Sequence, residues 1–279
     1  MATLTPEVLT SAYMTRSTAV RERVLAYVEA LWNGSASLRD SDIERLISRI
    51  APAVHGGQLQ VANITAAYIS QLAALERVGA APVRVERDEI LGYRGVPDEE
   101  VYRRPAVAVY AALSAGVPFS QARDVGLNRL KSIAATDMQQ ARNRQAQAGY
   151  AAGGFEYTVR VLSGNENCAL CVVAATQRYR VGGLQAIHPG CDCGERGVRG
   201  SYDPGVVLDR EMVEETHSAI WEQLGRFDRS AKDLGAEKVA SNGRRVSDFT
   251  DLIITRQHGE LGPTLAWRED KFTGPSGLN

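Results

Sequence analysis

The stretch of sequence that decides the fold is Cys168-Ala-Leu-Cys171, followed after sixteen residues by His188-Pro-Gly-Cys191-Asp-Cys193. The chain of 279 residues contains four cysteines, and all four fall within this stretch. Buried structural thiols would be scattered through a core, so the clustering needs a chemical reason. A Cys-x-x-Cys turn places two thiolates on one side of a tight loop, and a second pair completes the tetrahedral ligand set of Zn²⁺. The spacing therefore predicts a metal knuckle.

This knuckle, defined here as residues 165–197, offers five candidate ligands for four coordination positions. Either the four cysteines bind the metal, or His188 replaces one of the last pair; otherwise His188 supports the ligands from outside. Because no coordination position is left open, we expect a structural Zn²⁺ that fixes a loop-rich region with little apolar material of its own. The candidate metal ligands are Cys168, Cys171, His188, Cys191 and Cys193.

Four other interpretations of the cysteines remain to be weighed against the structural metal. Two disulfides would suit a virion or an extracellular destination. A redox Cys-x-x-Cys of the thioredoxin type needs a preceding strand and a long following helix, which the pattern lacks. The thiols could also be inert. A catalytic zinc of the deaminase type needs His-x-Glu upstream of Pro-Cys-x-x-Cys, and the order and spacing here are wrong. The structural metal is the favoured interpretation.

Before the knuckle, the first 150 residues have apolar positions at helical spacing. Ser17 is a candidate N-cap for the first helix, and Ser41 with Glu44 forms a capping-box pattern for the second. Pro52 and Gly56-Gly57 predict a break after the second helix. Residues 79–97 are rich in glycine, proline and charge and predict a connector. The expected helices span residues 17–32, 41–50, 58–77, 98–115 and 120–148.

The residue pattern changes at Gly153-Gly154. From there, large apolar and polar residues alternate with period two through 155–161. This alternation predicts a half-buried strand that leads into the knuckle. Helical spacing returns at 209–235, a short helix is expected over 247–258, and the tail 259–279 reads as irregular.

The expected fold class is mainly α. A helical N-terminal body is followed by a small α+β metal-knuckle region with a short β-hairpin and by C-terminal helices. The expected divisions are an N-terminal helical region at 1–80, a second region at 98–200 that carries the knuckle, and a C-terminal helical region with an irregular tail at 201–279.

Composition excludes several classes of function. The formal net charge is −1 and the pI is about 6.5, so a generally basic nucleic-acid binder is excluded. No apolar run approaches the roughly 20 residues that span a bilayer, and no secretory signal is visible, so we expect a soluble protein made in the cytoplasm. A local basic patch could still bind phosphates without reading bases. Its candidate residues are Arg123, Arg129, Lys131, Arg142, Arg144, Arg196 and Arg199.

A search for catalytic patterns finds no candidate catalytic residue. The chain has no Gly-x-Ser-x-Gly, no His-Glu-x-x-His, no phosphate-binding Gly-x-x-x-x-Gly-Lys-[Ser/Thr] and no Gly-x-Gly-x-x-Gly. The isolated histidines His55, His217 and His258 are more typical of packed or helix-terminal side chains than of ligands. We therefore expect no enzyme activity.

The expected strand, the Cys-x-x-Cys, Gly182-Gly183 and the closing His-Pro-x-Cys-x-Cys together resemble the Mu F-like phage head morphogenesis proteins, also called minor capsid proteins. Ile133-Ala-Ala-Thr136-Asp137, followed by Ala141-Arg142-Asn143, is similar to a helix of that family, with Asp in place of the usual Glu. The resemblance covers roughly residues 100–200. Where the family commonly has Pro before the His and Arg between the last cysteines, this chain has Ile187 and Asp192; the ligands are intact.

The resemblance implies a non-enzymatic protein packaged in few copies inside the phage head. Its partners would be the portal protein, the capsid interior and packaged DNA bound without sequence preference. No membrane or small-molecule substrate is implied, and the protein would pass from the host cytoplasm into the virion. Two alternatives are a capsid maturation protease or C-terminal effector enzyme, and a zinc-knuckle nucleic-acid-binding protein.

Overall fold

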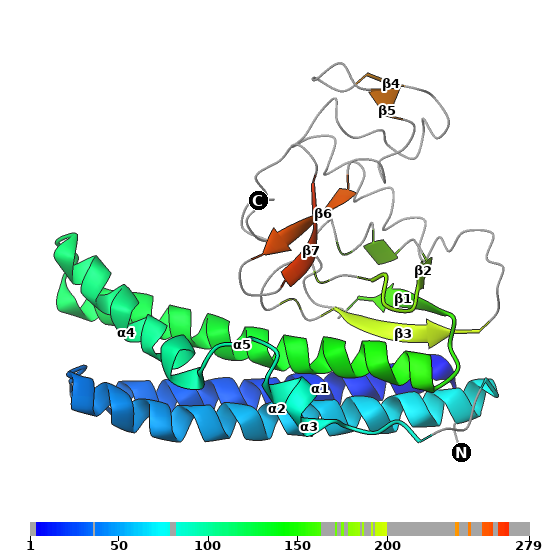
Figure 1. Cartoon of the computed structure of the whole chain (residues 1–279), viewed down its shortest axis with the longest axis horizontal. Helices are drawn as coiled ribbons and strands as arrows, with labels where there is room; N and C mark the ends of the chain where they lie inside the picture. The colour runs from blue at the N-terminus through cyan, green and yellow to red at the C-terminus, as the bar shows by residue number, and fades with distance from the viewer. Residues whose placement is uncertain are drawn as a thin grey trace. The chain divides into compact units, whose positions relative to one another are not determined.

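The chain divides into two compact units, Met1–Gly154 and Phe155–Asn279. The boundary falls where helical spacing in the sequence gives way to period-two alternation. Most of the described residues are helical, which confirms the mainly α class with a small antiparallel sheet (Figure 1). The predicted region 98–200 spans the boundary between the units. The computed structural model describes residues 4–35, 37–78, 82–162, 171, 174–175, 178–184, 186, 191, 193–199, 238–239, 245–246, 253–258 and 262–267.

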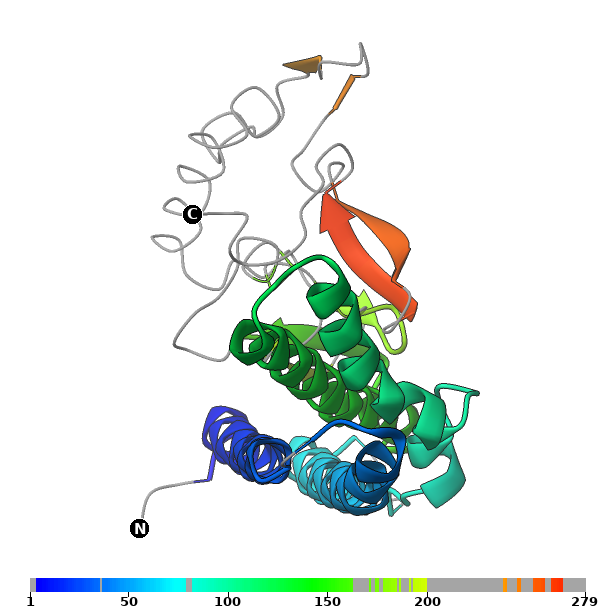
Figure 2. The same ribbon diagram turned by 90° about the vertical axis from the view of Figure 1, so that its left-hand side faces the viewer.

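The first unit consists of helices packed along one another. The long helices α1 and α2 form one layer, and the hairpin of α4 and α5 packs on it (Figures 1 and 2). One cluster of buried side chains, which includes Val28, Val54, Val109 and Leu130, joins all four helices. The helices are α1 (Pro6–Asn33), α2 (Asp40–Glu76), α3 (Arg87–Leu91), α4 (Asp98–Ser114) and α5 (Phe119–Ala152).

Helix α1 begins before the predicted start at residue 17. Thr5 is the N-cap, with its side-chain oxygen 3.3 Å from the backbone nitrogen of Val8, and Pro6 occupies the first helical turn, where its missing N–H costs nothing. Ser17 is 4% exposed inside the helix. The prediction that Ser17 caps this helix was therefore wrong, because the Thr5-Pro6 signal lies upstream.

Helix α2 runs without the break predicted at Pro52 and Gly56-Gly57. Pro52 is exposed, and the burial of a long apolar face offsets the cost of about 3 kcal/mol that an interior proline imposes. Gly57 marks a close approach between helices. A Cβ atom there would lie 2.6 Å from Cγ2 of Val24 on α1 and 2.9 Å from Sδ of Met138 on α5. The glycine thus serves packing and does not end the helix.

The carboxylate of Asp137 on α5, which is 3% exposed, ties the connector between α2 and α4 to the helical body. Tyr93 donates its hydroxyl to Oδ1 at 2.6 Å, and Arg94 donates Nε to the same oxygen at 2.8 Å. Tyr102 on α4 donates to Oδ2 at 2.7 Å. Burial and then the charge of Asp137 hold the pKa of Tyr102 well above its usual value, so this hydroxyl keeps its proton. The acidic residue of the motif helix is therefore a buried anchor.

The second unit is built on a three-stranded antiparallel sheet in the order β2-β1-β3, with β1 (Tyr157–Val161), β2 (Arg178–Arg180) and β3 (Gly194–Val198). Strand β1 confirms the strand predicted at 155–161. Tyr157 lies opposite Arg180 of β2 and Val198 of β3, and Arg160 lies opposite Glu195. The central strand is thus paired on both edges.

Two further hairpins follow: β4 (Lys238–Val239) pairs with β5 (Arg245–Val246), and β6 (Ile253–His258) pairs with β7 (Gly262–Trp267). The helix predicted over 247–258 was wrong for residues 253–258, and the irregular tail was wrong for 262–267. The β-branched run Ile253-Ile254-Thr255 favours a strand, and the short connection to β7 closes a hairpin. The helix predicted over 209–235 lies outside the described residues.

None of the helices in the described part of the chain is both long and apolar enough to cross a bilayer.

The close approach at Gly126 on α5 predicts a stability change. A Cβ atom there would lie 2.4 Å from Cγ2 of Val109 and 2.6 Å from Cζ2 of Trp32, whereas one at Gly56 meets nothing within 4 Å. We expect Gly126→Ala to lower the free energy of unfolding by about 1–3 kcal/mol through overpacking. Gly56→Ala is the control and should raise it by up to about 1 kcal/mol through helix propensity. Urea denaturation measures both, and equal effects would contradict this packing.

The Asp137 anchor predicts a larger loss. Asp137→Ala leaves the half-buried Arg94 guanidinium and two tyrosine hydroxyls without this acceptor, so we expect the free energy of unfolding to fall by about 3–5 kcal/mol. Asp124→Ala removes an exposed carboxylate from the same helix and should change it by less than about 0.5 kcal/mol. A thermal or urea unfolding curve for Asp137→Ala that superimposes on that of Asp124→Ala would refute the anchor.

Candidate metal centre

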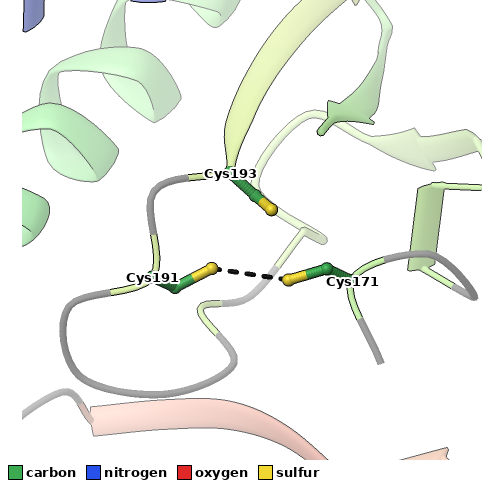
Figure 3. A group of neighbouring side chains, drawn as sticks. All are labelled: Cys171, Cys191 and Cys193. Atoms are coloured by element: carbon green, nitrogen blue, oxygen red, sulfur yellow. Dashed lines mark hydrogen bonds between the residues drawn. The ribbon is translucent and has the colours of Figure 1, made fainter. Parts of the chain in front are cut away.

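Three of the predicted ligands, Cys171, Cys191 and Cys193, lie together in the second unit (Figure 3). Their sulfur atoms all lie within 4.8 Å of one another, and the sulfurs of Cys171 and Cys191 are 3.4 Å apart. The three residues are 1%, 6% and 5% exposed, and none of them forms a disulfide. Cysteines separated in sequence thus converge in a buried cluster.

The sheet and its connections produce this convergence. Cys171 lies in the connection between β1 and β2, and Cys191 and Cys193 lead directly into β3. Because β1 pairs with both β2 and β3, the two connections meet at the same sheet. The short strands by themselves bury little apolar surface, so contacts among the connections matter for this unit.

The spacing of the sulfurs fits one metal ion. Zn²⁺ binds thiolate sulfur at about 2.3 Å, so two sulfurs of a tetrahedral site lie about 3.8 Å apart. The cluster, with all sulfurs within 4.8 Å, is compatible with this geometry. Three buried thiolates favour a soft or borderline ion over Mg²⁺ or Ca²⁺. These three cysteines lie close enough to bind a metal ion; the other two predicted ligands, Cys168 and His188, lie outside the described residues.

Sequence analysis did not single out Arg160, which interacts electrostatically with this cluster, or Tyr179, which interacts with Arg160. Arg160 is 4% exposed on β1, the central strand. Burial alone would lower the pKa of Arg160, but the negative charges of Cys171, Cys191 and Cys193 raise it overall. Tyr179 has a raised pKa because burial outweighs the opposing charge of Arg160. In the sequence, the only indication of this role was that Arg160 occupies a polar position of the strand predicted over 155–161.

The Cys193 thiol binds its proton tightly. A hydrogen bond with Cys171 lowers the pKa of Cys193, but a hydrogen bond with Cys191, burial and the charge of Cys191 raise it to about 11. A thiol in this state is a poor nucleophile at neutral pH. A bound metal would have to displace that proton, because only the thiolate is a metal ligand.

Several residues of the predicted nucleic-acid-binding set have structural contacts instead. Arg123 donates Nη1 to the carbonyl oxygen of Ser35 at 2.9 Å and Nη2 to that of Trp32 at 2.7 Å, and so caps the end of α1. Lys131 pairs with Glu29 at 2.9 Å. Arg142 is only 8% exposed. These placements argue against phosphate contacts by Arg123 and Arg142.

The other members of that set are more accessible. Arg144 is exposed, and its guanidinium carbon lies 5.3 Å from the ring centroid of Tyr93. Arg129 on α5 and Arg196 on β3 are half-buried, and Arg199, which follows β3, is exposed. The set is divided between the two units, so no single basic patch is established within either of them.

No protein-family model, curated protein or solved structure matches this chain. The cysteine cluster, its order in the fold and the sequence resemblance therefore carry the functional argument.

The raised pKa of Cys193 predicts how fast the thiol reacts in metal-free, reduced protein. We expect the rate of alkylation of Cys193 to rise with pH to an inflection near 11, compared with the ordinary thiol value of 9.0 once the chain is unfolded in urea. Peptide mass spectrometry after timed iodoacetamide labelling measures this rate. An inflection at or below 9 in the folded protein would contradict the surroundings described for this thiol.

Proposed function

We propose that this chain is a non-enzymatic minor capsid, or head morphogenesis, protein of a bacteriophage, with a structural Zn²⁺ in its second unit. The observation that carries the proposal is the buried cluster of Cys171, Cys191 and Cys193, set on a small sheet directly after a helical body. This order of helical body, strand and cysteine pattern is the one on which the resemblance to Mu F-like proteins rests. The protein would reside inside the capsid near the portal.

The metal in this proposal has a structural role. Three cysteines supply thiolates, and Cys168 or His188 supplies the fourth ligand and closes the coordination sphere. A closed site offers no position for substrate, so its contribution is to folding, on the order of 10 kcal/mol of binding free energy for a structural zinc. The three-stranded sheet, with strands of three to five residues, would depend on this contribution.

The helical body in this proposal supplies an interaction surface. Its exposed apolar side chains include Val107 and Tyr110 on α4 and Phe119 at the start of α5. In a phage head the partners would be the portal and the capsid interior, and packaged DNA would be contacted without sequence preference.

The experiment that tests the proposal is co-purification with the portal protein encoded by the same genome. We expect the full-length chain to co-elute with the portal on size-exclusion chromatography and to be found inside purified particles. Cys191→Ser should lose the metal and this association, because the knuckle would lose the ion that stabilises it. Arg180→Ser, which changes an exposed residue on β2 of the same sheet, is the matched control and should retain both.

The outcomes separate the function from the metal. A genome without a portal gene, or a wild-type chain that neither binds portal nor enters particles, would overturn the minor-capsid function. Normal incorporation of Cys191→Ser would leave the location intact but would remove the structural role of the metal.

A further inference from the structure

Arg160 is a permanently charged side chain in the interior of the second unit. It lies in β1, the central strand of the sheet, and is 4% exposed. A guanidinium does not lose its proton in a protein, so burial cannot be relieved by neutralisation. A buried charge of this kind is tolerated only where anions compensate it. The question is which anions these are.

The strand register places Arg160 on the same side of the sheet as Cys193, one residue of the cysteine cluster. Arg160 lies directly opposite Glu195 of β3, and directly opposite residues of an antiparallel pair share a face. Side chains alternate along a strand, so Cys193, two residues before Glu195, continues that face where the chain enters β3. Val161, next to Arg160, is opposite Gly194, next to Cys193. Arg160 and Cys193 thus lie on one face at the same end of the sheet.

The net charge of a metal–thiolate centre explains why a cation beside it would be favourable. A Zn²⁺ ion with three thiolates carries a net charge of −1, and a fourth thiolate makes it −2. Such a charge is costly in a buried site unless a cation lies nearby. All three cysteines of the cluster interact electrostatically with Arg160.

We propose that Arg160 is the counter-charge of the metal–thiolate centre and tightens metal binding without being a ligand. This inference rests on the metal centre proposed above and assigns Arg160 as its positioning residue. The guanidinium stabilises the thiolate form that binds the metal, and it leaves a centre of net charge 0 with a histidine as fourth ligand or −1 with a cysteine. Outer residues of this kind typically change metal affinity by about 10–100-fold when they are replaced.

Glu195 is the competing anion, because it lies opposite Arg160 in the register. If Arg160 served Glu195 alone, the two residues would form a cross-strand pair with no bearing on the metal. Under the proposal, removal of the Glu195 charge leaves metal affinity unchanged or tighter, since the guanidinium then serves the thiolates alone. Arg160 itself separates the two roles, because loss of its charge weakens metal binding under the proposal and leaves it unchanged if Arg160 serves Glu195 alone.

The test measures the affinity of the full-length, reduced protein for Zn²⁺ by chelator competition, and for Co²⁺ by its thiolate charge-transfer absorption. We expect Arg160→Met, which keeps the apolar stem but not the charge, to bind about 10–100-fold more weakly. Arg160→Lys should restore most of the affinity. Glu195→Gln and Arg178→Met are the controls; Arg178 is a half-buried arginine opposite Val159, on the other face of the sheet.

An Arg160→Met affinity equal to wild type, or an equal loss in Arg178→Met, would overturn the inference. If Arg160→Met does not fold even in excess Zn²⁺, Arg160→Lys decides: affinity within a few-fold of wild type supports the counter-charge, and a tenfold loss in the folded lysine variant overturns it. A wild-type chain that binds neither ion overturns the metal centre itself, so the two failures are distinguishable.

Discussion

The convergence of three buried sulfurs, all within 4.8 Å of one another, is the constraint on which the second unit depends. As protonated thiols these groups contribute only weak hydrogen bonds, and burial with the neighbouring Cys191 raises the pKa of Cys193 to about 11. As thiolates on one ion they would join the connection between β1 and β2 to the entry of β3. A sheet of three short strands gains much from such a crosslink, because its own apolar burial is small.

The first unit is stabilised differently, by close helix packing and one buried polar anchor. Gly57 and Gly126 allow neighbouring side chains to approach to distances that a Cβ atom would prevent. Asp137 gathers two tyrosine hydroxyls and the Arg94 guanidinium and so fixes the connector before α4. An extensive apolar core stabilises this unit, whereas the described part of the second unit contains the buried cysteine cluster.

The sequence predicted those features that arise from local patterning. Period-two alternation located β1, helical spacing located most of the helices, and cysteine spacing predicted the cluster, although Cys168 and His188 lie outside the described residues. The sequence did not predict the features that depend on tertiary packing. Helix α2 continues through Pro52 because its apolar face is buried along its length, and the alternation over 155–161 does not reveal that Arg160 is buried. Strand β6 was mistaken for a helix because short apolar runs fit both periods.

The most direct test of the account is the metal content of the full-length chain, purified under reducing conditions without a metal-chelating tag, combined with X-ray absorption spectroscopy. The account predicts one zinc per chain, with three or four sulfur neighbours at about 2.3 Å and few reactive thiols. Protein without metal, in which all four thiols react freely, would contradict the central claim and leave the cysteine cluster without a structural role.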